Sequence, residues 1–465
     1  MNVWVIIIGT VYFGVLVYVG LSSFRKTKSA EDYILGGSKL GTIIGMMTFA
    51  ATLFSTFTLM GMPDFFRLHG VGAWIFLAIS DAAMFFLILW FGFHLRRRAS
   101  KENYKGVGGL MNSCFGTPWA GRVYFLGVFL FLIPYVAIQI RGIAIFLNAV
   151  FPEALPPWGW SLGIVGIMLM YSELGGLKAI IYNDVIQGTI LLVVLWIIAA
   201  GCLNHFGGIA NMFDQVKQVD ESLLSTPGPN GLFTFQFLFS SFFAIILIPV
   251  TQPQVTTRLV IMRSKKTLHS MAVSLGIFTF LILTPTIFIG LYGAVLYGDT
   301  DTETFLANVL LFEQIDFIAA LVVIGLLAAA TSTADSQIFA LGSELRSLLK
   351  GDEKKIMRIT RIAIFSFGFA ALIFSIFSTN ELVLLARLSF AGTSIMAPMI
   401  LTGLFAKGKP SPIIIWSTAA GILIFLASLL KLVPEMIGFM RIDLLLLIVL
   451  TVIAIIAAKM QVKTH

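Results

Sequence analysis

The residues best suited to chemistry stand in a short polar run, ATSTADS at positions 330–336, inside a long apolar stretch. Residues 317–330 carry no charge, and the chain becomes apolar again at 338–341. The run brings a carboxylate, Asp335, and the hydroxyls of Ser332, Thr333 and Ser336 to the depth of a membrane-spanning helix. Polar groups are costly to place in lipid unless they find partners. The run therefore predicts a binding site or path for an ion or solute.

Two other apolar stretches carry signs of a broken helix. One holds several hydroxyls close together, among them Thr52, Ser55 and Thr58, and the other contains Pro249 and Pro253. Proline removes a backbone donor, and non-helical backbone at membrane depth is tolerated where it lines a cavity or is covered by protein. We expect a cavity between these stretches. The alternative is that the hydroxyls bond to their own helix.

One arginine, Arg141, falls inside an apolar stretch. A guanidinium at that depth needs an anion or several carbonyls, and its planar fork suits a carboxylate. Three interpretations remain open. Arg141 binds the carboxylate of a substrate, it pairs internally with Asp81 or Asp335, or its side chain reaches toward the membrane surface. A charged and unpaired Asp81 would favour a substrate with an amine or several hydroxyls.

The composition is that of a membrane protein: 58% of residues are hydrophobic and 12% are charged, against about 25% charged in soluble domains. The net charge of +8 does not indicate a nucleic-acid partner, because the basic residues stand in short segments between apolar stretches. The two cysteines and five histidines form no metal-ligand or disulfide pattern. No catalytic motif is found, so we do not expect an enzyme.

A spanning helix needs about 20 mostly apolar residues, and thirteen segments meet that requirement. We therefore expect an all-α integral membrane protein. The predicted spans are 3–22, 41–62, 71–95, 122–150, 157–176, 182–204, 231–251, 268–296, 314–345, 358–378, 381–405, 411–431 and 439–459.

The basic residues predict the topology. With the N-terminus outside and the C-terminus inside, most of the 31 Lys and Arg residues fall in inner segments, Arg258 among them. The outer segments hold only Arg67, Lys217, Lys431 and Arg441. This agrees with the positive-inside rule and predicts a multi-pass protein of the inner (plasma) membrane. A surface helix is expected near 209–217, in the longest outer loop.

The broken spans 2 and 7 are five spans apart, so they cross the membrane in opposite senses. This predicts two inverted repeats with discontinuous helices, as in many secondary transporters. We expect a single transport domain over 1–465. It would comprise a peripheral first helix and loop (1–40), a first repeat (41–204), a second repeat (231–405) and two C-terminal helices (406–465).

Four segments resemble the sodium:solute symporter family, with features of its sialic acid and proline/pantothenate branches. They are AEDYILGG at 30–37, GGLKAIIYNDVIQG at 175–188, QPQVTTR at 252–258 and AATSTADS at 329–336. The resemblance implies a LeuT-like fold and a sodium ion as the coupled cation. It implies a main sodium site formed by Ala51, Phe54, Ala329, Ser332 and Thr333.

In the sialic acid symporters a second sodium site falls at positions that match Asp184, Ser332, Asp335 and Ser336. This chain differs from them in having Asp335 where they have a serine, so Asp335 could hold a cation or a proton, or pair with an arginine. Asp184 could instead cap a helix end. The same relatives place a carboxylate-binding arginine at what looks like Arg141. Substrate-binding residues are expected to be Thr52, Leu53, Ser55, Thr58, Asp81, Gln139, Arg141 and Gln252.

The leading hypothesis is a sodium-coupled symporter that imports a small, carboxylate-bearing organic solute, such as a sialic acid, an amino acid or a monocarboxylate, by alternating access. The expected partners are the solute, sodium and the lipid bilayer, with the protein acting as a monomer. The alternatives are a proton-coupled carrier that uses Asp335 or Asp184, a sodium-coupled sugar or polyol symporter, and a membrane receptor that does not transport.

Overall fold

The computed structural model describes residues 2–26, 33, 35–37, 39–102, 104–151, 153–171, 176–406 and 408–462. Parts of two family-like segments, including Ala30 and Gly175, lie outside the described residues. Each of the thirteen predicted spans coincides with a helix or a group of helices. By length and composition, nine helices of the described residues are able to cross a membrane, or ten with one bent pair, so the count of thirteen stays a prediction.

The first half of the chain begins with a long helix, continues through a broken one and then forms longer helices. Its elements are α1 (Asn2–Lys26), α3 (Thr42–Leu53), η1 (Phe57–Gly61), α4 (Met62–His69), η2 (Ile75–Ile79), α5 (Ser80–Ala99), α6 (Val107–Phe115), α7 (Pro118–Val150), α8 (Pro157–Tyr171) and α9 (Gly176–His205).

The second half repeats the pattern of a broken helix followed by long ones. Its elements are α10 (Ile209–Val219), η3 (Glu221–Leu224), α11 (Phe235–Ile246), α12 (Ile248–Thr251), α13 (Pro253–Val260), α14 (Lys265–Leu296), α15 (Thr302–Ala307), η4 (Asn308–Phe312), α16 (Asp316–Leu348), α17 (Glu353–Phe377), α18 (Leu382–Ser394), α19 (Ala397–Phe405), α20 (Ile413–Leu429), a hairpin of β1 (Met436–Ile437) and β2 (Met440–Arg441), and α21 (Ile442–Val462). The surface helix expected near 209–217 is α10.

Both predicted breaks are present. α3 ends at Leu53, where Phe54 takes an extended backbone with φ −88° and ψ 113°, and the span bends by 63° between its two halves. The second break lies at Gln252, which is extended with φ −97° and ψ 117°, and Pro253 begins α13. Proline suits the first position of a helix, where its missing N–H costs nothing.

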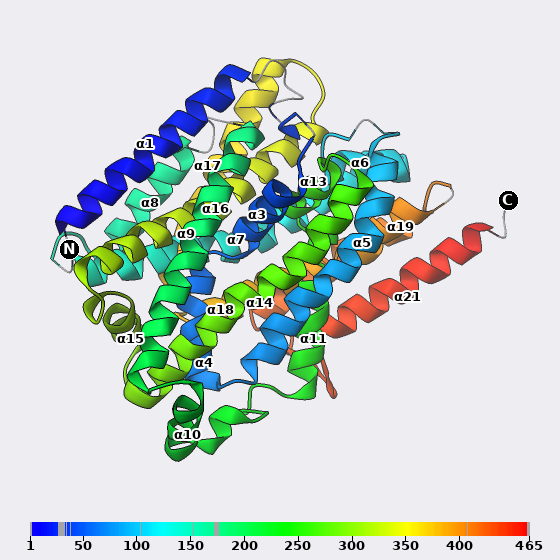
Figure 1. The fold of residues 1–465 in the computed structure, drawn as a ribbon. Coiled ribbons are helices and arrows are strands. Elements are labelled where there is room, and N and C mark those ends of the chain that lie inside the picture. The colour runs from blue at the N-terminus through cyan, green and yellow to red at the C-terminus, as the bar shows by residue number, and fades with distance from the viewer. Residues whose placement is uncertain are drawn as a thin grey trace.

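A group of central helices surrounds the two breaks. α16 packs against α9 and α7, α3 packs against α9 and α14, and α13 contacts α5 and α16. α1 and α21 lie at opposite edges of the bundle (Figure 1). At one end of α21, Asp443 accepts a hydrogen bond of 2.6 Å from Arg387 of α18. This buried ion pair attaches the last helix to the bundle.

Candidate functional site

The candidate sodium site lies where α3 ends against α16. The carbonyl oxygen of Ala51, close to the end of α3, accepts hydrogen bonds of 3.2 Å from the hydroxyls of both Ser332 and Thr333. Neighbouring residues on a helix point about 100° apart, so both reach one carbonyl because the end of α3 lies between them. Three of the five predicted ligands therefore meet at one point, buried in the protein.

The other two predicted ligands stand beside this point. Phe54 directly follows α3, and its extended backbone turns its carbonyl away from the helix ladder. Ala329 lies on α16 one turn before Thr333 and is buried. An unwound helix end supplies free carbonyls, and oxygen ligands suit a hard cation. Among the described residues no group of three or more His, Cys, Asp and Glu side chains could hold a metal ion.

Asp184 of α9 is the carboxylate nearest to the site. It is fully buried. Its Oδ1 accepts a hydrogen bond of 2.5 Å from the Ser332 hydroxyl, and its Oδ2 accepts one of 2.5 Å from the Thr48 hydroxyl of α3. One aspartate thus joins α3, α9 and α16 at the sodium site, and the alternative that it caps a helix end finds no support in these contacts.

Arg258 is the functional residue that sequence reasoning missed. The positive-inside argument placed it in an inner segment, whereas the structure buries it to 1% exposure at the end of α13. Its Nη2 lies 2.8 Å from Oδ2 of Asp184. It also donates bonds of 2.8 Å to the Ser336 hydroxyl and 2.9 Å to that of Thr48. Its place within two turns of a proline break was the sequence signal that pointed to burial.

These contacts involve the residues of the second predicted cation position. Asp184, Ser332 and Ser336 do come together, as the resemblance implied, but the Arg258 guanidinium lies among them. Asp335 is also buried, and its Oδ1 has no hydrogen-bond partner among the described residues. Asp335 is therefore a second buried carboxylate, close enough to Asp184 to interact with its charge.

The hydroxyls of the first break serve mainly to hold the break itself. The backbone N–H of Ser55 donates to the Thr58 hydroxyl at 3.1 Å, and the Gln139 amide of α7 donates to the Ser55 hydroxyl at 3.1 Å. The amide oxygen of Gln139 accepts a bond of 3.3 Å from the backbone N–H of Thr56. Side chains thus replace the missing helix bonds. The approach of α7 is close, since a Cβ at Gly142 would lie 2.1 Å from Cγ2 of Thr56.

Two tyrosines of α7 satisfy carbonyls at both breaks. The Tyr135 hydroxyl donates to the carbonyl of Leu53 at 2.6 Å, and the Tyr124 hydroxyl donates to the carbonyl of Thr251 at 3.0 Å. Gln252, at the second break, is fully buried and accepts a bond of 2.7 Å from the Gln254 amide. Its own Nε2 has no partner among the described residues, so this amide is available to a ligand.

The remaining substrate-binding predictions separate into two places. Thr52 is buried beside the sodium site, and its hydroxyl lies 3.4 Å from that of Ser336. Arg141 pairs with neither Asp81 nor Asp335. Its Nη2 and Nε donate to the amide oxygen of Asn380 at 2.7 and 3.0 Å. Within the described part of the chain Asp81 is buried and has no hydrogen bond or ion pair.

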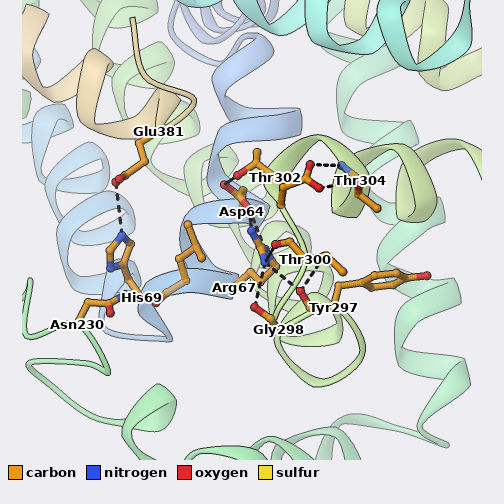
Figure 2. A network of polar contacts seen from close by, with 12 residues as sticks. Asp64, Arg67, His69, Asn230, Tyr297, Gly298, Thr300, Thr302, Thr304 and Glu381 are labelled. Carbon is orange, nitrogen blue, oxygen red and sulfur yellow. Dashed lines mark hydrogen bonds and ion pairs between the residues drawn. The ribbon is translucent and has the colours of Figure 1, made fainter. Parts of the chain in front are cut away.

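The half of the broken span formed by α4, which is the outer half in the predicted orientation, is held by a separate polar network (Figure 2). Arg67 of α4 pairs with Asp64 at 2.7 Å and donates bonds of 2.9 Å to the backbone carbonyls of Tyr297 and Thr300. Asp64 also accepts a bond of 2.8 Å from the Thr302 hydroxyl at the start of α15. These contacts tie α4 to the segment between α14 and α15.

Beside this network His69 lies 3.7 Å from the carboxylate of Glu381, the neighbour of Asn380. The residue pair 380–381 thus contacts both α7 and α4, through Arg141 and His69. It links the predicted solute-binding arginine to the outer half of the broken span.

A small cavity adjoins the ion pair. Its lining includes Arg258 and Ser336 of the candidate site, and Lys105 and Glu344 beside the start of α6. Next to it, the Tyr104 hydroxyl lies 3.2 Å from that of Thr257. Glu344 accepts bonds of 2.8 and 2.7 Å from the backbone N–H groups of Val107 and Gly108. The start of α6 is thereby fixed against α16 at this end of the cavity.

The relatives of this chain are membrane transporters. It is 24% identical over 438 residues to the high-affinity proline transporter PutP of Bacillus subtilis, covering 89% of each chain. It is 23% identical to a sodium/pantothenate symporter of Haemophilus influenzae over 89% of this chain and 83% of that protein. Over 45% of this chain it is 30% identical to the sodium/sialic acid symporter NanT of Aliivibrio fischeri, which it covers to 40%.

Solved structures share the fold. A Na⁺-coupled sialic acid symporter in a substrate-bound outward-open state superposes with a TM-score of 0.79 at 18% identity, covering 98% of each chain. MhsT in complex with L-phenylalanine superposes with a TM-score of 0.54 at 16% identity, over 91% of this chain and 97% of that one. These likenesses confirm the all-helical, LeuT-like fold. The model of the sodium:solute symporter family matches residues 33–411, so this chain belongs to the sodium:solute symporter family.

Proposed function

We propose that this protein uses the sodium gradient to import a small organic solute that carries a carboxylate. It acts by alternating access, as a monomer in the inner (plasma) membrane. In this proposal the chain crosses the membrane thirteen times with its N-terminus outside, and residues 41–204 and 231–405 form the inverted repeats. The observation that carries the proposal is the meeting of the Ala51 carbonyl with the Ser332 and Thr333 hydroxyls, each at 3.2 Å.

Sodium binds between α3 and α16 in this proposal. The carbonyls of Ala51, Phe54 and Ala329 and the hydroxyls of Ser332 and Thr333 are its ligands. In the present contacts both hydroxyls donate to the Ala51 carbonyl. A bound ion would take the oxygen lone pairs, and the hydroxyl hydrogens would turn away. Sodium would then hold the two helices together and favour the solute-binding conformation, and the solute would favour sodium by the same factor.

Arg258 acts as a fixed cation at the second position. Because its guanidinium lies among Asp184, Ser332 and Ser336, a second sodium could bind there only if Arg258 moved away. A buried ion pair of this kind is held by its geometry and further hydrogen bonds, and Thr48 and Gln254 supply them at 2.9 and 2.6 Å. We therefore assign one sodium ion to the conformation described.

Arg141 receives the solute carboxylate. It is bonded to Asn380, a neutral amide whose oxygen a carboxylate can replace with a stronger, charge-assisted bond. Proline, pantothenate and sialic acid, the solutes in the relatives' names, all carry a carboxylate. Asp81 and the free amide of Gln252 offer polar contacts to the rest of the solute, and Thr52 and Leu53 lie beside the break.

The test of the sodium site is a pair of substitutions, Ser332→Ala and Thr333→Ala. Each is expected to raise the sodium concentration that gives half-maximal thermal stabilisation of the purified protein by about tenfold, because each removes one polar ligand of a charge. Ser375→Ala in α17 is the control, since that buried hydroxyl bonds only to its own helix, at 2.7 Å. Unchanged sodium midpoints in both variants would refute the site.

The solute class is tested with the same protein in vesicles. Uptake of proline, pantothenate and sialic acid is compared under a sodium gradient and under a pH gradient without sodium. Proton-driven uptake would favour the alternative of a proton-coupled carrier, for which the unpartnered Oδ1 of Asp335 is the specific observation. Uptake of a sugar or polyol instead would favour the neutral-solute alternative.

A further inference from the structure

The first helix touches the bundle along a narrow stripe. Tyr12 and Leu16 of α1 are 5% and 4% exposed and pack against Ile324 and Ala328 of α16. Gly9 continues the stripe, since a Cβ there would lie 3.4 Å from the Ile324 side chain. By contrast, Tyr18 on the same helix is 73% exposed. α1 lies along one edge of the bundle (Figure 1), where it contacts α16 and α9.

The stripe ends in a polar contact that lipid packing does not require. The Gln187 amide of α9 donates a bond of 2.8 Å to the Tyr12 hydroxyl and one of 3.2 Å to the Thr331 hydroxyl of α16. Thr331 bonds back to its own helix at the carbonyl of Leu327, at 2.8 Å. Three helices, α1, α9 and α16, thus meet at one glutamine side chain.

This contact lies directly behind the sodium site. Gln187 follows Asp184 by three residues on α9, so both lie on neighbouring faces of one turn. Thr331 precedes Ser332. Two hydrogen bonds therefore join α9 to α16 along their line of contact, the α9–α16 seam. Ser332 donates to Asp184 at 2.5 Å, and the Gln187 amide donates to Thr331 at 3.2 Å. α3 covers the first bond, and Tyr12 of α1 covers the second.

We propose that Tyr12 is a positioning residue for sodium binding, and that α1 uses its hydroxyl to hold the α9–α16 seam at the spacing that the sodium ligands need. The inference rests on the proposed sodium site and extends it to a helix that contributes no ligand. Without the Tyr12 hydroxyl the Gln187 amide loses an acceptor inside the membrane, where a replacement is scarce. The amide then rotates, and Ser332 is held less firmly.

The experiment is a sodium titration of Tyr12→Phe in the full-length purified protein. The readout is the thermal stabilisation by sodium chloride, with potassium chloride keeping the ionic strength constant. Phenylalanine keeps the ring and its packing and removes only the hydroxyl. The sodium midpoint is expected to rise about threefold to tenfold, with the melting temperature in potassium chloride unchanged. Tyr18→Phe, the same change on the exposed face of α1, is expected to leave the midpoint unaltered.

A double-mutant cycle with Gln187→Leu sharpens the result. The double variant should lose no more sodium affinity than the larger single loss, because both changes break one contact. Equal midpoints for wild type and Tyr12→Phe would overturn the proposal, as would a melting temperature that falls without a change in the midpoint. Ser332→Ala is titrated alongside. If it too binds sodium normally, the sodium site itself is refuted, and the positioning role of Tyr12 with it.

Discussion

The two halves of the broken span each meet an aspartate–arginine pair, and the pairs differ in what they join. Asp64 and Arg67 lie three residues apart on α4. Arg67 also donates hydrogen bonds to backbone carbonyls of the segment between α14 and α15. Asp184 and Arg258 come from α9 and α13 and bond to the hydroxyls of Thr48, Ser332 and Ser336. The outer pair has no bond to a proposed sodium ligand. In the inner pair, Asp184 accepts a hydrogen bond from Ser332, which is a proposed sodium ligand.

This difference separates two functions of a buried ion pair. The outer pair fixes the shape of a surface segment, so its loss should affect local mobility and leave sodium binding unchanged. The inner pair draws on an oxygen that is also a proposed sodium ligand. Movement of Arg258 would therefore change the sodium site, and sodium binding would change the strength of the pair.

The largest effect is expected for Arg258→Gln. It leaves the Asp184 charge buried without its partner, and removing one member of a buried pair typically costs about 3–5 kcal/mol. We expect loss of transport and a large drop in the unfolding temperature. The double variant Asp184→Asn/Arg258→Gln should recover much of the stability, because no unpaired charge remains. A double variant as unstable as Arg258→Gln alone would show that packing, and not charge, dominates this site.

A smaller and different effect is expected for Arg67→Gln. The variant loses the bonds to loop carbonyls and leaves the buried Asp64 with the Thr302 hydroxyl as its partner, at a cost of about 3 kcal/mol, the lower end of the range for a broken buried pair. Hydrogen exchange should accelerate in residues 297–305, while the sodium midpoint stays within about twofold of wild type, since this network has no atom in the sodium site. A sodium midpoint that shifts as much as in Ser332→Ala would remove the distinction between the two pairs.

The Arg141 contact lies near the outer network, but we propose that it serves solute binding. Arg141→Lys should weaken binding of a carboxylate solute about tenfold, because lysine lacks the planar fork, and should leave sodium-induced stabilisation unchanged. Binding is measured by isothermal calorimetry with the solute that vesicle uptake identifies. Asn380→Ala is the matched variant and should not weaken binding, since it removes a competitor of the solute. Normal binding in Arg141→Lys would return this arginine to a structural role.

The smallest effect concerns the cap of α15, next to the outer network. The backbone N–H of Thr304 donates to Asp301 at 2.9 Å and holds the pKa of that carboxyl below its usual 3.8. A depressed pKa gives stability that is present above the unfolded value and is lost as the pH falls through the folded value. The protection factors of amides 302–307, which correct for the pH dependence of intrinsic exchange, should therefore fall as the pH drops from about 5 to about 2. Asp301→Ala should show this low protection already at neutral pH.

Much of the architecture could be predicted because the membrane limits the alternatives. Apolar length predicted a helix or group of helices at each of the thirteen positions, and prolines with clustered hydroxyls predicted both breaks. The polar run at 329–336 led to Ser332 and Thr333, which the structure places on the carbonyl of Ala51.

The partners of the charged residues could not be predicted from the sequence. Arg258 had the pattern of an inner-loop residue, and its burial against Asp184 depends on the angle at which α13 leaves the break. None of the three alternatives for Arg141 included Asn380. The short connection between α17 and α18 brings Asn380 to α7, and the sequence does not indicate this approach. Such contacts depend on the relative placement of helices, which hydropathy does not report.

The two tyrosines of α7 give the two broken spans a common reference. Tyr124 and Tyr135 are eleven residues apart on one unbroken helix, which sets their hydroxyls about 16 Å apart along its axis. Each holds the carbonyl at one break, so a displacement of α7 lengthens or shortens both bonds together. The two interruptions are nearly two hundred residues apart in the chain. Because both bond to α7, a movement of this one helix changes the position of both.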